Sequence, residues 1–176
     1  MAKKTLFLEE YTIKGSHSDK ANALTEKVDS KSGAKIFNSV VELFCFAALI
    51  GCYKNRRAKP EKDSTRTKKI FADAFRSHSE QLKLAFKFVI LTSDKLFPDS
   101  VERINKTFRN PETDENYTLF EEYALGGIDE LYDVLMVDTN TRFEDYLTAL
   151  NKLISEITSI ETDDSLLENP STEAFF

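Results

Sequence analysis

The chain has 176 residues, of which 41% are hydrophobic and 31% are charged, and its formal net charge is −6. This length and composition support one domain with a buried core, which excludes a fibrous or globally disordered chain. Gly and Pro are scarce, at 5 and 4 residues, while long stretches repeat apolar residues with helical spacing. These features favour an all-α fold, and we expect a compact multi-helix bundle.

The charge is distributed unevenly along the chain. Residues 1–111 hold 22 basic and 13 acidic side chains, a net charge of +9, whereas residues 112–176 hold 2 basic and 17 acidic side chains, a net charge of −15. Such asymmetry predicts either that the two halves pair within or between subunits, or that the basic half meets an acidic partner such as nucleic acid. An acidic face kept for solubility is the alternative.

The N-terminal third contains short elements and then one very apolar helix. Leu6–Ile13 is predicted as a short strand or extended arm, and a polar helix is expected from about Ser18 to Asp29. Val40–Tyr53 carries a single charge, at Glu42, and its apolar side chains cover both helical faces. We therefore predict that it is the central buried helix of the bundle, with Asn38 as its N-cap.

Two further helices are expected after the central one. A helix at about 79–93 carries one apolar face. A second, at roughly 98–108, is predicted to begin with Pro98 in its first turn and to turn Val101, Ile104 and Phe108 inward.

The C-terminal third should contain two amphipathic helices. After a turn-rich acidic linker at 110–116, they are expected at 118–137 and at 142–160. The first contains Gly126 and Gly127, and adjacent glycines inside a helix imply a kink, a break or a tight crossing against another backbone. Residues 1–35 are expected to form the N-terminal arm and polar helix, 36–160 the helical domain and 161–176 a flexible acidic tail.

A run of basic residues follows the central helix. Residues 54–69 hold eight basic and two acidic side chains around Pro60 and show no apolar periodicity, which predicts an exposed loop. Its cations could contact the phosphates of DNA without reading sequence. A solvated loop, or one that pairs with the acidic third of another subunit, is the alternative. The candidate nucleic-acid-binding residues are Lys54, Arg56, Arg57, Lys59, Lys62, Arg66, Lys68 and Lys69.

Candidate catalytic groups are few. His17 and His78 are the only histidines, and neither has an identifiable relay partner, so surface or capping roles are predicted for both. Glu122, Asp129 and Asp133 share a helical stripe that could hold a divalent metal as in nucleases, although such a stripe is more often the polar face of an amphipathic helix. We predict no catalytic residue, no metal and no cofactor.

The lengths of the apolar stretches in the sequence predict where the protein resides in the cell. The longest apolar stretch, residues 40–53, is shorter than the roughly 20 residues that cross a bilayer. The N-terminus lacks the apolar run and cleavage site of a signal peptide. A soluble cytoplasmic protein without membrane contact is expected. Cys45 and Cys52 lie about 10 Å apart along one helix, too far for a disulfide, and should be free thiols.

Two stretches together are similar to a known family. They are IFNSVVELFCFAALIGCYKNRR at 36–57 and TLFEEYALGGIDELYDVL at 118–135. The pair resembles small accessory proteins associated with DNA phosphorothioation (Dnd) modification and restriction systems, from which Leu125 departs where a more polar residue is expected. The matching positions are Phe46, Ala47, Ala48, Gly51, Tyr53, Phe120, Glu121, Glu122, Tyr123, Ala124, Gly126 and Gly127.

The resemblance implies an accessory role in DNA modification or phage restriction, and it supplies no catalytic residues. We therefore predict a non-enzymatic accessory or interaction protein. Its acidic C-terminal third would contact other proteins of the system, and its basic loop would contact the DNA backbone. The alternatives are a DNA-binding transcriptional regulator of the defence cluster and a metal-dependent nuclease that uses helix carboxylates. A homodimer is also compatible with the opposite charge fields.

Overall fold

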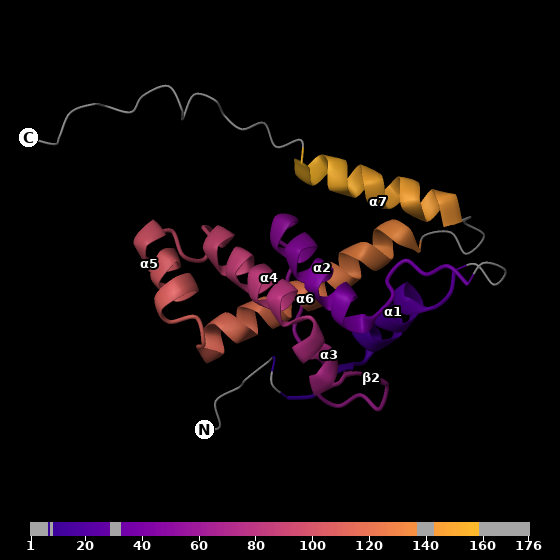
Figure 1. Ribbon diagram of the computed structural model, residues 1–176, viewed down its shortest axis with the longest axis horizontal. Coiled ribbons are helices and arrows are strands. Elements are labelled where there is room, and N and C mark those ends of the chain that lie inside the picture. The colour runs from indigo at the N-terminus through magenta and orange to yellow at the C-terminus, as the bar shows by residue number, and fades with distance from the viewer. Residues whose placement is uncertain (1–6, 8, 29–32, 137–142, 159–176) are drawn as a thin grey trace, which may run out of the picture.

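The computed structural model describes residues 7, 9–28, 33–136 and 143–158. These residues are mostly helical, so the predicted all-α class is confirmed. Figure 1 shows the helices gathered around the long helix α6. The described elements are, in chain order, β1 Tyr11–Lys14, α1 Ser16–Thr25, α2 Val40–Tyr53, β2 Thr67–Ile70, α3 Ala72–Ser77, α4 Ser79–Thr92, α5 Ser100–Ile104, the π-helix η1 Asn105–Arg109, α6 Asp114–Leu135 and α7 Phe143–Thr158.

Helix α2 is the predicted central helix, and its bounds are those predicted. Its N-cap is Ser39, whose Oγ accepts a hydrogen bond from the backbone N–H of Glu42 at 3.3 Å. The Glu42 carboxylate in turn accepts the backbone N–H of Asn38 at 3.1 Å. The prediction of Asn38 as the cap was wrong by one residue, because a hydroxyl residue three positions before Glu allows this reciprocal pair of bonds.

Helices α2 and α6 cross so closely that their backbones touch at glycines. A Cβ atom added to Gly51 would overlap the carbonyl oxygen of Tyr123, and one added to Gly127 would overlap that of Ala47. Helix α6 continues through both of its glycines without interruption. Of the three interpretations of the glycine pair, the tight crossing is therefore confirmed, because only residues without side chains let two helix axes approach this far.

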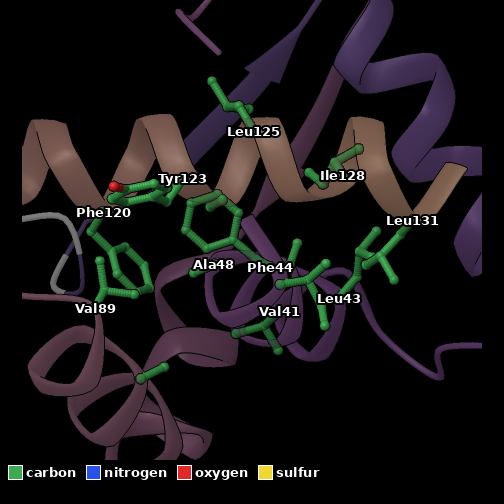
Figure 2. Close-up of a cluster of buried hydrophobic side chains, with 14 of the residues drawn as sticks. Val41, Leu43, Phe44, Ala48, Val89, Phe120, Tyr123, Leu125, Ile128 and Leu131 are labelled. Atoms are coloured by element: carbon green, nitrogen blue, oxygen red, sulfur yellow. The ribbon is translucent and has the colours of Figure 1, made fainter. Parts of the chain in front are cut away.

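Large apolar side chains fill the space on either side of this crossing. Figure 2 shows Leu43 and Phe44 of α2 facing Phe120 and Ile128 of α6, while Leu125 points to the opposite side of α6. All five side chains are buried. Phe44 and Phe120 pack edge to face with ring centroids 5.8 Å apart, an arrangement favoured by aromatic quadrupoles.

The N-terminal elements close the far side of α6. Strand β1 pairs with β2 in an antiparallel ladder that places Tyr11 opposite Ile70 and Lys14 opposite Thr67. The strand predicted within Leu6–Ile13 therefore exists from Tyr11 onward; Leu6 and Leu8 lie outside the described residues. The end of the basic run forms β2 rather than a loop. The predicted acidic tail at 161–176 also lies outside the described residues.

In the short helical segment formed by α5 and η1, the apolar residues point outward, opposite to the direction predicted from the sequence. Val101, Ile104 and Phe108 are exposed, and the prediction that they face inward was wrong. Pro98 precedes the N-cap Asp99 instead of lying in the first turn. The inward side is polar because the Arg103 guanidinium donates to the carbonyl oxygens of Phe97 and Pro98, at 2.6 and 2.9 Å.

The remaining helices lie close to their predicted positions. Helix α6 begins at Asp114, four residues before the prediction, because the Thr113 hydroxyl accepts the backbone N–H of Asn116 at 3.2 Å and caps it inside the supposed linker. Helices α4 and α7 match the segments expected at 79–93 and 142–160. Among the described residues, no helix combines the length and apolarity needed to span a bilayer.

Candidate functional site

The basic run after α2 lies as a strap across α6. The backbone N–H of Arg56 donates to the carbonyl of Gly51 at 2.8 Å, which turns the chain at the end of α2. The N–H of Ala58 then donates to the carbonyl of Glu122 at 2.9 Å. A Cβ added to Gly126 would overlap the Arg56 carbonyl, so the first of the two adjacent glycines of α6 makes room for this strap. We call residues 54–66 the basic strap.

Both arginines at the start of the basic strap are paired with carboxylates of α6. Arg57 donates from Nε to Glu122 Oε2 at 2.8 Å, and its guanidinium also lies 5.8 Å from the centre of the Tyr123 ring. Arg56 donates to Glu130 and Asp133, each at 2.8 Å. The Glu122 side chain is only 11% exposed, so its charge depends on Arg57 for compensation.

Three other cations of the run are paired as well. Lys54 lies 2.9 Å from Glu156 of α7, Lys69 lies 2.7 Å from Glu10, and Arg66 binds Asp19. The pairs of Lys54, Arg56 and Arg57 join the basic run to acidic residues of the C-terminal part, so the internal pairing of the two charge fields, one of the alternatives left open by the sequence, is present in the fold. Glu10 and Asp19 belong to the basic half itself. Lys59, Lys62 and Lys68 form no ion pair with any residue in the described ranges.

A second buried polar group joins α1 to α6. The His17 ring is 6% exposed, and its Nε2 donates to Asp129 Oδ2 at 3.3 Å, while Lys20 lies 2.8 Å from Asp129 Oδ1. The prediction that His17 lacks a partner and lies at the surface was wrong. A carboxylate accepts only, so this contact places the proton on Nε2; Nδ1 is buried and has no hydrogen-bond partner among the described residues.

This group makes part of the stability depend on pH. Burial by itself would raise the pKa of Asp129, but hydrogen bonds and charges from His17 and Lys20 outweigh burial and leave the pKa below its ordinary value. The carboxylate therefore stabilises the fold above an unfolded-state pKa of about 3.9, and this contribution is lost as the pH falls through the lowered pKa. Asp129→Asn should cost stability at neutral pH, and the cost should become smaller as the pH falls below the unfolded-state pKa, measured by urea unfolding at pH 7 and pH 3. An equal cost at both pH values would contradict this assignment.

Tyr11 and Glu121 form a third cross-link to α6. The Tyr11 hydroxyl donates to Glu121 Oε1 at 2.9 Å. Burial, and then the Glu121 charge, raise the pKa of Tyr11, which keeps its hydroxyl protonated as a donor. A carboxylate that is 4% exposed is thereby held by the first strand of the fold.

The three carboxylates proposed as a metal site do not converge. Glu122 pairs with Arg57, Asp129 with His17 and Lys20, and Asp133 with Arg56. No group of three His, Cys, Asp or Glu side chains within the described part of the chain is arranged to hold a metal ion. His78 Nδ1 donates to the Ala74 carbonyl at 3.0 Å and lies 3.0 Å from the Ser77 hydroxyl, at the junction between α3 and α4.

Most of the positions that carry the family resemblance lie at or beside the α2–α6 crossing. Ala47 and Gly51 of α2 meet Gly127 and the Tyr123 carbonyl of α6, whereas Gly126 faces Arg56 of the basic strap. Ala48 is buried beside this contact. Phe120, Tyr123 and Ala124 belong to the buried core. Glu121 and Glu122 are the carboxylates held by Tyr11 and Arg57. These positions therefore build a helix crossing and its polar cross-links.

Phe46 and Tyr53 lie on the other face of α2, in a half-open apolar groove of about 1110 Å³ between α2, α4 and α7. We call it the α2–α4–α7 groove. The two cysteines also line it and are free thiols, as predicted. Burial, followed by the nearby charge of Glu42, raises the pKa of Cys45 to about 11, and burial raises that of Cys52. Both thiols are therefore weak nucleophiles at neutral pH.

Comparison with known proteins identifies the family. Residues 16–168 match the family model described as DNA sulphur modification system-associated protein 4. The chain belongs to this family. The matched range includes α1 to α7, with both the crossing and the basic strap, and the resemblance to Dnd-associated proteins is confirmed. No curated protein and no solved structure matches the chain.

Sequence reasoning missed two of the three links to α6. The His17–Asp129 and Tyr11–Glu121 pairs join residues more than one hundred positions apart. One signal was available: Glu121 and Asp129 both interrupt the apolar faces of a helix that is otherwise buried over most of its length. A carboxylate at such a position requires a partner, because burial of an unpaired charge is costly.

Proposed function

We propose that this chain is a non-enzymatic accessory protein of a DNA sulphur-modification system and acts by binding other proteins of that system. One observation carries the proposal: the carboxylates of α6 that could have held a metal or moved a proton are each paired with a cation or hydroxyl of the same chain. These carboxylates would therefore stabilise the fold by joining α6 to other elements of the chain. Family membership supplies the system.

Co-purification tests this proposal. The tagged full chain is recovered from cells that carry the complete modification system, at about 0.1 M and about 1 M salt. We expect another protein of the system to be retained at both salt concentrations, because contacts through apolar surface resist screening. Recovery of the chain without any such protein would contradict the proposal.

A nuclease assay tests the non-enzymatic part separately. Plasmid DNA is incubated with the protein and Mg²⁺ or Mn²⁺, and no cleavage is expected. Cleavage that is lost in both Asp129→Ala and Asp133→Ala, with folding retained by circular dichroism, would establish the metal-dependent nuclease instead.

DNA contact is a second candidate function, favoured by the three lysines of the basic run that have no ion pair among the described residues. Lys59 and Lys62 are exposed and Lys68 is half-buried in β2. In contrast, Arg56 and Arg57 are occupied by α6 carboxylates, which a DNA phosphate would have to displace. We therefore assign any backbone contact to the three lysines. The contact would be independent of sequence, as expected for phosphate binding.

A gel-shift series distinguishes this candidate. Changing Lys59, Lys62 and Lys68 to Glu should weaken duplex binding at low salt and reduce the salt slope by about 2 to 3. The matched control changes the exposed Lys83, Lys87 and Lys95 to Glu, with the same change in net charge. Equal losses in both triple variants would mean that net charge alone produces the binding. Strong preference for one sequence would favour the transcriptional regulator.

A further inference from the structure

The α2–α4–α7 groove has apolar walls that the described residues leave open to water. Three of its lining residues, Leu84, Phe88 and Ile154, are 72%, 47% and 39% exposed. Contiguous exposed apolar surface on a folded chain is typical of a place that another segment or molecule covers. The position of the groove relative to the end of α7 indicates which segment that is.

The groove extends along two parallel helices. At one end, Glu42 of α2 lies 3.8 Å from His78, the N-cap of α4. At the other end, Cys52 of α2 lies 3.4 Å from Thr92, the last residue of α4. At 1.5 Å per residue, the α2 wall between these two contacts is about 15 Å long.

The last turn of α7 is fastened to the second of these ends. The Tyr53 hydroxyl donates to the Glu156 carbonyl at 3.1 Å, and Lys54 lies 2.9 Å from the Glu156 carboxylate, where Figure 1 shows α7 beside α2. Ile157 lines the groove, and α7 ends one residue later, at Thr158. The chain therefore continues from the edge of the groove.

The sequence after α7 places apolar residues within reach of the groove. Residues 159–176 lie outside the described residues. Leu166 and Leu167 are adjacent in this stretch and follow Thr158 by eight and nine positions. Eight residues of extended chain span up to about 26 Å, which exceeds the length of the groove wall. The leucine pair can therefore reach any part of the groove.

The match to the family model also continues beyond α7. It covers residues 16–168, so it includes ten residues after Thr158 and ends one residue after Leu167. Phe175 and Phe176 lie outside it. The sequence shared with the family thus contains the leucine pair and not the phenylalanine pair. We call residues 159–168 the shared tail segment.

The charges of the groove and of the shared tail segment are complementary. The segment holds four acidic and no basic side chains, whereas residues 76–95, which include α4, hold four basic and two acidic side chains. Opposite net charges favour their association. Lys95 lines the groove near the end of α4, and the acidic lining residues Glu42 and Asp94 lie toward its two ends. The middle of the groove is left for uncharged side chains.

We propose that the shared tail segment folds back over the α2–α4–α7 groove of its own chain and places Leu166 and Leu167 in it. Attachment to α7 gives the segment an effective concentration in the mM range, so a modest affinity keeps the groove covered. A protein that used the same surface would have to displace the segment. The contact is independent of the function proposed above.

Thiol alkylation of the full chain tests the contact. Cys45 and Cys52 are the only cysteines, and both line the groove. The rate at which iodoacetamide labels them at about pH 8.5 therefore reports access to the groove. Leu166→Glu/Leu167→Glu should raise this rate at least about tenfold, because burial of two unpaired charges in an apolar groove is costly and the segment is released.

The matched control makes the same change in charge at the phenylalanine pair. Phe175→Glu/Phe176→Glu lies outside the family match and should be labelled at the wild-type rate. Circular dichroism and urea unfolding of both variants verify that the helices are retained. A faster rate in a folded variant then reports release of the segment and not unfolding.

A variant on the groove side should act through the same contact. Leu84 is exposed, so the fold should tolerate Leu84→Glu. This change alone should also raise the labelling rate at least about tenfold. In the Leu166→Glu/Leu167→Glu chain it should produce no further increase, because both changes remove one interaction. Phe71→Glu, at an exposed phenylalanine that does not line the groove, is the control and should have no effect.

Labelling at several protein concentrations separates the possible occupants. A contact within one chain gives a wild-type rate that is independent of concentration. Protection that increases with concentration would overturn the proposal, because a second copy would then cover the groove. Wild-type labelling of Leu166→Glu/Leu167→Glu, or equal acceleration in the phenylalanine control, would overturn it as well.

One further outcome assigns the groove to a partner. If Leu166→Glu/Leu167→Glu is labelled at the wild-type rate while a co-purified protein of the modification system slows the labelling, the groove belongs to that protein. This result overturns the contact within the chain and leaves the proposed function standing.

Discussion

Replacing Gly127 by alanine should lower the free energy of unfolding by about 3 kcal/mol, although alanine is the better helix former by about 1 kcal/mol. The added methyl group would occupy the position of the Ala47 carbonyl oxygen, closer than the 3.0 Å below which real Cβ contacts essentially do not occur. The obstructing atoms are the backbone atoms of Ala47, which cannot rotate away as a side chain can, so one helix would have to move as a whole. Chemical denaturation monitored by circular dichroism measures the loss.

The control for this substitution is Thr118→Ala. Thr118 lies in the same helix but is exposed, so alanine there should be neutral or slightly stabilising. If Gly127→Ala were as stable as wild type, α2 and α6 could not cross at the separation described here. The same reasoning applies to Gly51, which meets the Tyr123 carbonyl from the other helix.

Removing Arg57 should have the second largest effect, about 2 kcal/mol in Arg57→Ala. The Glu122 side chain is 11% exposed, and Arg57 is its only side-chain partner in the described part of the chain, so the substitution would leave this carboxylate unpaired. A fully buried pair would lose more, but Arg57 is 39% exposed and water can partly replace it. The double variant Arg57→Ala/Glu122→Leu should recover at least about 1 kcal/mol, because no unpaired buried charge remains.

Lys59→Ala is the matched control for Arg57. It removes a cation from the same strap, but one that is exposed and has no ion pair in the described part of the chain, so its effect should stay within about 0.5 kcal/mol. Equal stability of the Arg57 and Lys59 variants would show that the arginine is not structural. Thermal unfolding of both proteins provides an independent measurement.

The burial of the central helix could be predicted because its composition is compatible only with a position inside the fold. A helix with a single charge and apolar residues on both faces cannot lie at the surface, so α2 had to be buried. The glycine pair was informative for a related reason, since its cost within α6 demanded a compensating contact. The sequence could not choose between a kink and a crossing, because that choice depends on Gly51 in a distant helix.

The α5–η1 segment shows where periodicity fails. The spacing of Val101, Ile104 and Phe108 predicts an apolar face correctly, but it does not say that the face is turned inward. Arg103 and Thr107 form hydrogen bonds on the inner side instead, and these local bonds fix the orientation. An apolar helix face can pack into the core of its own chain or be exposed for contact with another molecule, and the spacing of the apolar residues is the same in both cases.

Charge asymmetry offered a pairing of the two halves as one alternative and did not identify the residues that form it. From the sequence alone, the eight cations at 54–69 could not be distinguished. In the fold, Arg56 and Arg57 form ion pairs with carboxylates of α6, whereas Lys59 and Lys62 are exposed. That division depends on where the chain turns after α2. It changes the DNA-binding test, because Glu at either arginine would disturb the fold as well as any contact with phosphate.

Most of the family-motif residues build one crossing, between α2 and α6, on which the rest of the domain is assembled. Native-state hydrogen exchange tests it directly. Amides near Ala47 in α2 and near Tyr123 in α6 should exchange only through global unfolding, with the same free energy of opening. Exchange of the α2 amides at a clearly lower free energy, while those of α6 stay protected, would contradict the claim.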